Sequence, residues 1–239
     1  MAQEHTVRSF DDELNELRSI ISQMGGMAEA QLASAMEAVS NRNDELAHKV
    51  LAADQRLDRL EADADKLAVE IIARRAPMAD DLREIIAALK TASMLERIGD
   101  YAKNIAKRST VLSHSKAVAP ASVVPAIAGE SQQMIRDVLD AFIERDSDRA
   151  VEVWERDQRV DQLYDSLFRE LLTYMMENPK LITPCTHLLF IAKNLERIGD
   201  HATNIAEIVY FAVEGKEMDE RRPKGDETSF AVVSPDDQD

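Results

Sequence analysis

The sequence predicts an all-α protein made of two tandem three-helix bundles, with six long helices related by an internal duplication. Three observations support this fold class. Glycine and proline, which interrupt helices and form turns, occur only seven times each in 239 residues. Apolar residues recur at the three- and four-residue spacing of one helix face along most of the chain. A six-residue segment occurs twice, which indicates that one half of the chain repeats the other.

Helical periodicity defines three helices in the first half. The first is expected over about 10–39, after a start at Ser9 that resembles a capping box. The second is expected over about 43–74. The third follows a break at Pro77 and extends to about residue 112.

The second half repeats this order of elements. Helices are expected over about 126–144 and 147–177. The last helix is expected to begin with Thr183 as its N-cap and Pro184 as its first residue, and to end near Gly215. Because the connections within each half are short, neighbouring helices should be antiparallel.

Three domain-level segments follow from this pattern. Residues 113–125 contain two prolines and are expected to link the halves, so that the first bundle spans 1–118 and the second spans 119–215. Residues 216–239 mix charged residues with glycine and proline, and are expected to form a disordered acidic tail. Within that tail the apolar segment 230–233 is expected to have no role of its own.

Charge and composition exclude several functional classes. The net charge is −16, of which the tail contributes only −4, so the folded body repels nucleic-acid phosphates and anionic lipids. A single cysteine, Cys185, allows no internal disulfide and is expected to be a packing residue. No apolar run is long enough to span a membrane, and no secretory signal begins the chain. We expect a soluble, cytoplasmic protein without direct membrane insertion or nucleic-acid binding.

The repeated segment carries acidic residues at helical spacing. Leu-Glu-Arg-Ile-Gly-Asp ends at Asp100 and again at Asp200, and each copy continues as Ala-x-Asn-Ile-Ala after one variable residue. Each copy therefore places Glu, Asp and Asn four residues apart on one helix face. A shorter repeat precedes each copy and contributes two further aspartates. The resulting candidate metal ligands are Asp54, Asp58, Glu96, Asp100 and Asn104 in the first half, and Asp157, Asp161, Glu196, Asp200 and Asn204 in the second.

Hairpin geometry brings these acidic residues together. In an antiparallel hairpin, two residues at equal distances along the chain from the turn lie level. Asp58 and Glu96 are equally far from Pro77, where the first turn is expected. Asp161 and Glu196 are equally far from the junction that precedes Pro179. Each half should therefore hold four level carboxylates, which are unfavourable unless cations or protons neutralise them.

Two interpretations of these carboxylates remain open. Oxygen ligands suit Mg²⁺, Mn²⁺, Ca²⁺ or iron rather than zinc held by thiolates. Alternatively, they form a solvated acidic face that nearby arginines neutralise: Arg56, Arg97, Arg159 and Arg197. Gly99 and Gly199, each in the middle of a helix, suggest that another helix approaches closely or that an ion needs space.

Histidine and other chemical motifs add little. His201 could join a metal site but is expected to be uninvolved and partly exposed. Di-iron bundles need two Glu-x-x-His pairs, and only the pair Glu45 and His48 occurs. No nucleophile triad, P-loop or dinucleotide-binding glycine motif is present.

The doubled motif Leu-Glu-Arg-Ile-Gly-Asp-x-Ala-x-Asn-Ile-Ala, each copy preceded by an Asp-x-x-x-Asp helix, closely resembles the PhoU family. The resemblance covers about 10–215. It implies two three-helix bundles whose Glu/Asp-x-x-x-Asp motifs hold metal ions, either iron or zinc clusters or magnesium or manganese. By motif match, the implied ligands are Glu96, Asp100, Glu196 and Asp200, with Asn104 and Asn204 as neighbours.

The resemblance also implies a role rather than a reaction. PhoU-like proteins restrain phosphate uptake and the phosphate-starvation response, acting between the ABC phosphate transporter, through its ATPase subunit, and a sensor histidine kinase. The implied location is peripheral at the inner membrane, through protein partners, and the implied assembly is a homodimer. Two departures limit the transfer of metal sites: Tyr164 and Phe168 replace Glu61 and Asp65, so equal metal loading of the two halves is not expected.

Three functional hypotheses result. The leading one is a non-enzymatic regulator of phosphate homeostasis (the Pho regulon). The alternative from another class is a carboxylate bundle for metal storage or metalloenzyme activity, which would take up metal in bulk or turn over redox substrates. A third is a scaffold whose acidic faces bind basic partner segments without metal.

Overall fold

Over residues 2–218, which the computed structural model describes, the chain forms six long α-helices. They are α1 (Ala2–Asn41), α2 (Asp44–Arg75), α3 (Asp80–Ser113), α4 (Val124–Glu144), α5 (Ser147–Glu177) and α6 (Ile182–Glu214). Short 3₁₀ helices precede α4 and α6 at Ala119–Ser122 and Pro179–Leu181. The predicted fold class of two three-helix bundles is confirmed.

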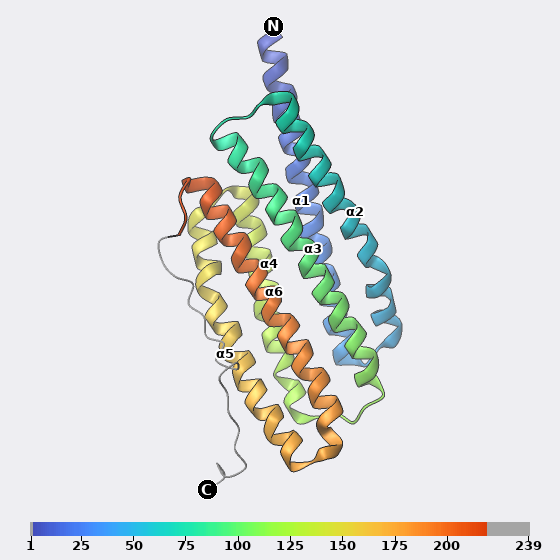
Figure 1. Cartoon of the computed structure of the whole chain (residues 1–239). Helices are drawn as coiled ribbons and strands as arrows, with labels where there is room; N and C mark the ends of the chain where they lie inside the picture. Colours follow the sequence, from blue (N-terminus) through green and yellow to red (C-terminus); the bar gives the residue numbers. More distant parts are fainter. Residues whose placement is uncertain (1, 219–239) are drawn as a thin grey trace.

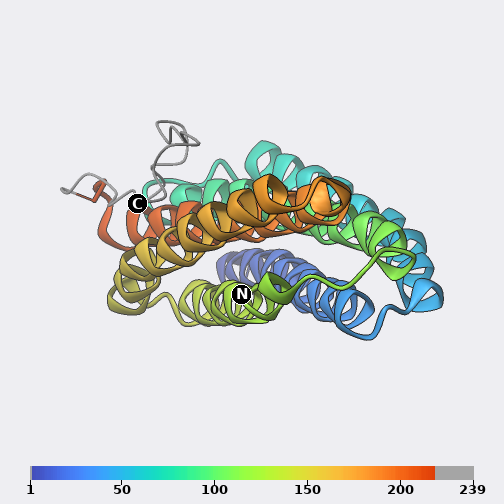
Figure 2. The same ribbon diagram turned by 90° about the horizontal axis from the view of Figure 1, so that it is seen from below.

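The helices lie in two layers. Figure 2 shows α2, α3, α6 and α5 side by side in one layer, with α1 and α4 in the other. In the middle of the four-helix layer α3 and α6 are antiparallel neighbours (Figure 1), and they join the two halves. Tyr101 of α3 and His201 of α6 stack there with ring centroids 5.5 Å apart, and these two residues occupy equivalent positions in the repeat. The halves are thus related by an approximate two-fold axis between α3 and α6.

Equivalent caps begin the second helix of each half. Asn43 accepts a hydrogen bond from the backbone N–H of Leu46 at 3.0 Å, and Asp146 accepts one from Arg149 at 3.0 Å. Each cap satisfies a backbone donor that the helix leaves free at its N-terminus. The caps fix where α2 and α5 begin.

Three helix boundaries differ from the sequence-based expectation. α1 begins at Ala2 rather than near residue 10, because no glycine or proline interrupts the preceding residues. α4 begins at Val124, two residues early, with Pro125 in a first turn that needs no N–H donor. α6 begins at Ile182, and Leu181 rather than Thr183 is its N-cap. The physical reason is the 3₁₀ turn, where Asn178 accepts from the N–H of Lys180 and leads directly into α6.

Charged contacts fasten the two halves together. Glu84 of α3 contacts Arg18 of α1 at 2.5 Å, and also Arg145, which caps α4, at 2.9 Å. Arg136 of α4 contacts Glu29 of α1 at 2.7 Å. Because apolar side chains of all six helices share one buried cluster, these ion pairs flank a continuous core. The relative position of the two bundles is therefore held by packing as well as by charge.

The chain beyond α6 is only partly described. Gly215 ends the helix in a left-handed conformation with φ of 71°, and Met218 packs against the core. Residues 219–239, which contain most of the predicted acidic tail and its apolar segment, lie outside the described residues. None of the helices within 2–218 combines the length and the apolar character that crossing a membrane requires.

Candidate functional site

The first half brings acidic side chains of α2 and α3 together. The carboxylates of Asp58, Glu61, Glu96 and Asp100 form what we call the first cluster. Burial raises the pKa of Glu96, and the negative charge of Asp100 raises it further. Glu61 and Asp58 act in the same direction from α2, and Arg97 opposes them. Carboxylates from both helices are therefore close enough to interact, as the hairpin geometry predicted.

Water reaches most of the first cluster. The Glu96 side chain is 21% exposed, and Asp58 is exposed on the surface of α2. Lys103 lies 3.5 Å from Asp100, and Arg97 lies 3.9 Å from Glu96. Asn104 follows half-buried on α3, one turn further along. Asp54, a predicted ligand, lies in α2, but its side chain is outside the described part of the structure.

The second half holds a much more buried group. The carboxylates of Asp157, Asp161, Glu196 and Asp200 form what we call the second cluster. Asp157, Asp161 and Glu196 are 2%, 3% and 5% exposed. Lys193 donates to Oε1 of Glu196 at 2.8 Å, while Oε2 of Glu196 is buried without a hydrogen-bond partner. The sequence did not predict this difference in burial between the two clusters.

The environment of Glu196 favours its protonated form. Burial raises its pKa to about 7, and the charges of Asp200 and Asp161 contribute in the same direction. The hydrogen bond from Lys193 lowers the pKa but does not cancel the effect of burial. Near neutral pH, this carboxyl group is therefore poised between its neutral and charged forms.

Small residues let the helices approach each other at both clusters. A side chain at Gly99 would overlap Leu57 of α2, and its Cβ would lie 3.0 Å from Oε1 of Gln31. At the equivalent Gly199, the nearest atoms are those of Val160 at 3.5 Å and Oδ1 of Asp157 at 3.6 Å. The close approach that the repeated glycine suggested is present at Gly99, and the contact at Gly199 is looser.

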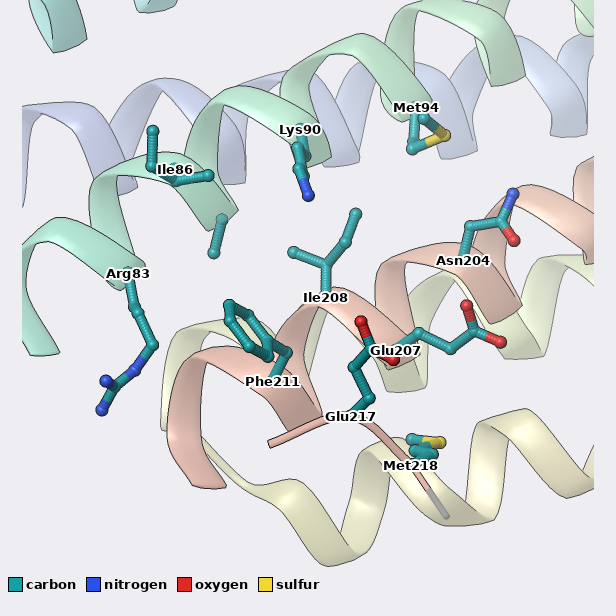
Figure 3. A pocket seen from close by; sticks show the side chains of 11 residues that line it. Arg83, Ile86, Lys90, Met94, Asn204, Glu207, Ile208, Phe211, Glu217 and Met218 are labelled. Atoms are coloured by element: carbon teal, nitrogen blue, oxygen red, sulfur yellow. The ribbon is translucent and has the colours of Figure 1, made fainter. Parts of the chain in front are cut away.

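Asn204 lines a cavity between α3 and α6. The cavity has a volume of about 590 Å³. Figure 3 shows Asn204 on its wall with Lys90 and Met94 of α3, while Phe211 and Ile208 of α6 supply apolar surface. The amide group of Asn204, one turn beyond Asp200, therefore borders the seam between the two halves.

The remaining candidates have structural roles. Cys185 is buried, in agreement with a packing role. His201 stacks on Tyr101, and its Nδ1 lies 3.1 Å from the sulfur of Met94. Glu45 pairs with Lys49 at 2.8 Å at the exposed start of α2. Each of these contacts is made within the chain itself.

The donor chemistry of the clusters fits a hard cation, although their side chains do not enclose one as they stand. Over the described part of the chain, no three carboxylate, imidazole or thiol groups lie together as a formed metal site. The unpartnered Oε2 of Glu196 and the carboxylates gathered across each hairpin are the features that a cation would satisfy. Binding would require side chains to rotate toward the ion.

Sequence reasoning missed one residue of this region. Lys193 occupies the position that Ser93 occupies in the first half, and it supplies a positive charge inside the second cluster. A comparison of the two copies position by position, at the spacing of the repeat, would have found it. The motif itself is identical in both halves and carries no such signal.

Comparisons with known proteins agree with the duplicated architecture. The family model described as PhoU domain matches residues 21–109 and again 124–209. A Zymomonas mobilis protein named "Phosphate-specific transport system accessory protein PhoU homolog" is 52% identical over 91% of this chain and 92% of its own. The Escherichia coli K12 protein named "Phosphate-specific transport system accessory protein PhoU" is 38% identical over 97% and 95%.

Solved structures show the same fold. A crystal structure of PhoU from Pseudomonas aeruginosa has a TM-score of 0.84 at 39% identity, and it matches 87% of this chain and 100% of its own. The PhoU structure from Streptococcus pneumoniae, titled a phosphate transport system regulatory protein, has a TM-score of 0.82 at 26% identity over 88% and 100%.

Proposed function

The chain belongs to the PhoU family, and from this premise we propose that it is a non-enzymatic regulator of phosphate transport. Its finer role in this proposal is to restrain phosphate uptake and the phosphate-starvation response when phosphate is plentiful. It would do so by coupling the ATPase subunit of the ABC phosphate transporter to the sensor histidine kinase. The observation that carries the proposal is the doubled acidic motif on α3 and α6. Relatives named as accessory proteins of phosphate-specific transport match the chain along nearly its whole length.

The architecture supports a role in protein contacts. The first cluster is carried by α2 and α3 and the second by α5 and α6, and these four helices form one layer of the molecule (Figure 2). The exposed carboxylates of the first cluster favour selective contact with a basic partner surface, whereas most of the second cluster is buried. Because the negatively charged body repels anionic lipid, we propose that the protein reaches the inner membrane through its protein partners. We also propose that it is a homodimer.

We also propose that the acidic clusters hold cations. A cation would neutralise carboxylates that otherwise repel each other across each hairpin. The candidate ions are Mg²⁺, Mn²⁺, iron or zinc, and their role in this proposal is regulatory or structural. The ligand set proposed here is Asp54, Asp58, Glu96, Asp100 and Asn104 in the first half, and Asp157, Asp161, Glu196, Asp200 and Asn204 in the second.

Co-purification tests the proposed coupling. The full chain carrying an affinity tag is expected to retain both the transporter ATPase and the kinase from membranes of cells grown in high phosphate. The double variant Glu96→Gln and Glu196→Gln should retain less of both partners, and its matched control replaces Glu45 and Glu70, which lie outside both clusters, with glutamine. That control should retain both partners as well as the unchanged chain does. Recovery of neither partner above the level of the tag alone would contradict the proposal.

A further inference from the structure

Apolar side chains form much of the cavity between α3 and α6. Figure 3 shows Ile86 and Met94 of α3 on one side of it and Ile208 and Phe211 of α6 on the other. Phe211 is 38% exposed although it is a large apolar residue. A volume of about 590 Å³ lies within the range of ligand-binding pockets. The cavity therefore suits an apolar group of the size of several side chains rather than a lone ion.

Two cations and two carboxylates also line the cavity. Figure 3 shows the Lys90 side chain pointing into it from α3. The guanidinium group of Arg83 contacts Asp80, and the buried Nε of Arg83 has no hydrogen-bond partner. Glu207 and Glu217 belong to α6 and to the residues that follow it. The α3 wall therefore offers donors to carboxylate or carbonyl oxygens of a bound segment.

Positive charge continues from the cavity along the seam between α3 and α6. Arg97 lies two turns beyond Lys90 on α3, and it is exposed. Arg197 of α6 crosses the seam, with its Cζ 5.9 Å from the centroid of the Tyr101 ring. Within residues 2–218, neither Lys90 nor Arg197 forms an ion pair with a carboxylate. In a chain of net charge −16, these cations are available to an acidic segment.

The two ends of the seam differ, although they are equivalent in the repeat. At one end the cavity lies between Lys90 and Ile208. At the other end the equivalent residues are Phe190 and Arg108, and the Cζ of Arg108 lies 4.0 Å from the centroid of the Phe190 ring. That contact bridges α3 and α6 with side chains of the chain itself. The cavity lies at the end where the chain leaves α6, because Met218 is part of its lining.

The chain itself supplies a segment with matching chemistry. Residues 219–239 follow Met218 directly and contain seven acidic and three basic residues. Apart from two prolines, their apolar residues are contiguous at 230–233. Acidic pairs flank this segment on both sides: Asp226 with Glu227, and Asp236 with Asp237. The residues 219–229 can span up to about 36 Å, so the apolar segment can reach back to a cavity that Met218 lines.

We propose that the apolar segment 230–233 binds in the cavity between α3 and α6 of its own chain, with its acidic flanks toward the cations of the seam. Phe230 supplies the aromatic side chain that packs against the apolar wall. Because the segment is tethered beside the cavity, its effective concentration there is high. Such binding does not depend on the proposed role in phosphate transport. It gives the segment 230–233 a role that the sequence alone did not predict.

Protection of a cysteine in the cavity tests this proposal in the full chain. Ile86→Cys places a thiol in the cavity wall, and Cys185→Ala removes the only other one. Phe230→Ser should raise the rate at which this thiol reacts with a bulky neutral maleimide by about tenfold, because it removes the apolar anchor of the segment. Thr186→Cys, at the equivalent position of the repeat, is the matched control. Its reaction rate should not respond to Phe230→Ser.

Charge variants of residues 219–239 test the contribution of the seam cations. Replacing Asp226 and Glu227 with the corresponding amides should also raise the reaction rate of the thiol at residue 86, by a smaller factor. Added salt should act in the same direction, because it screens exposed charges. Replacing Arg221 and Arg222 with glutamine removes charge of the opposite sign and should not raise the rate.

Three outcomes would overturn the proposal. The first is an equal reaction rate at residue 86 with and without Phe230→Ser. The second is an equal rise at residues 86 and 186, since this would reflect a general loosening of the helices. The third is protection that increases with protein concentration, because the segment would then come from a second copy of the chain. Circular dichroism of each variant verifies that the helical fold is retained.

Discussion

Replacing Glu196 with glutamine is expected to remove a large part of the pH dependence of stability. The pKa of Glu196 is about 7 in the folded protein, against 4.5 for an ordinary glutamate. Between these two pKa values the unfolded chain releases the Glu196 proton while the folded chain keeps it. The contribution of this proton to stability is therefore fully present below the pKa of the unfolded chain and is lost as pH rises through the pKa of the folded protein. The wild type should lose about 2–3 kcal/mol more than Glu196→Gln between roughly pH 5 and pH 8.

Urea unfolding of the metal-free protein at the two pH values measures this difference. The variant cancels contributions from other titrating groups, because those groups are present in both proteins. Glu96→Gln is the matched control: burial also raises the pKa of Glu96, but its side chain is 21% exposed, so its pH effect should be smaller. Equal pH dependence in the wild type and in Glu196→Gln would show that the buried carboxyl group is not protonated in the folded state.

Alanine substitutions at the two equivalent glycines are expected to have opposite effects. In the middle of a helix, glycine to alanine contributes about 1 kcal/mol through backbone entropy. At Gly199 the new methyl group meets Val160 at an ordinary contact distance, so Gly199→Ala should stabilise the protein by up to that amount. At Gly99 it overlaps the fully buried Leu57, and such overpacking costs about 1–3 kcal/mol.

A double variant identifies the cause of this difference. Leu57 is equivalent to Val160 in the repeat, so Leu57→Val gives the first half the shorter side chain of the second. We expect Leu57→Val to cost about 1 kcal/mol in the wild type, but to relieve the overlap in Gly99→Ala, so that the two changes together cost less than their sum. Thermal or urea unfolding of the three variants measures this coupling. Strictly additive effects would mean that Leu57 is not the residue that excludes a side chain at Gly99.

Much of the fold was readable from local patterns. Pro77 lies between α2 and α3 as predicted, because a proline cannot continue a helix through its own missing N–H. With the turn at Pro77, the equal distance of Asp58 and Glu96 from the turn predicted that their side chains lie near each other. The charge of Asp58 raises the pKa of Glu96 across the hairpin, in agreement with this prediction.

The burial of the second cluster could not be read in the same way. Identical motifs end at Asp100 and Asp200, yet exposure depends on what neighbouring helices place over them. Lys193 of α6 contacts both Glu196 and the ring of Tyr164 of α5, and neither Lys193 nor Tyr164 belongs to the motif. The predicted start of α6 was wrong for a related reason. Thr183 and Pro184 resemble the start of a helix, but the preceding 3₁₀ turn leads into α6 at an earlier residue.

The most direct test of the account is the expression of phosphate-responsive genes in cells that lack this protein and grow in high phosphate. Regulation of phosphate uptake predicts that these genes become active although phosphate is plentiful, and that the wild-type chain restores their repression. The double variant Glu96→Gln and Glu196→Gln should restore it only in part, because it removes the central carboxylate of each cluster. Unchanged expression after deletion in high phosphate would contradict the central claim.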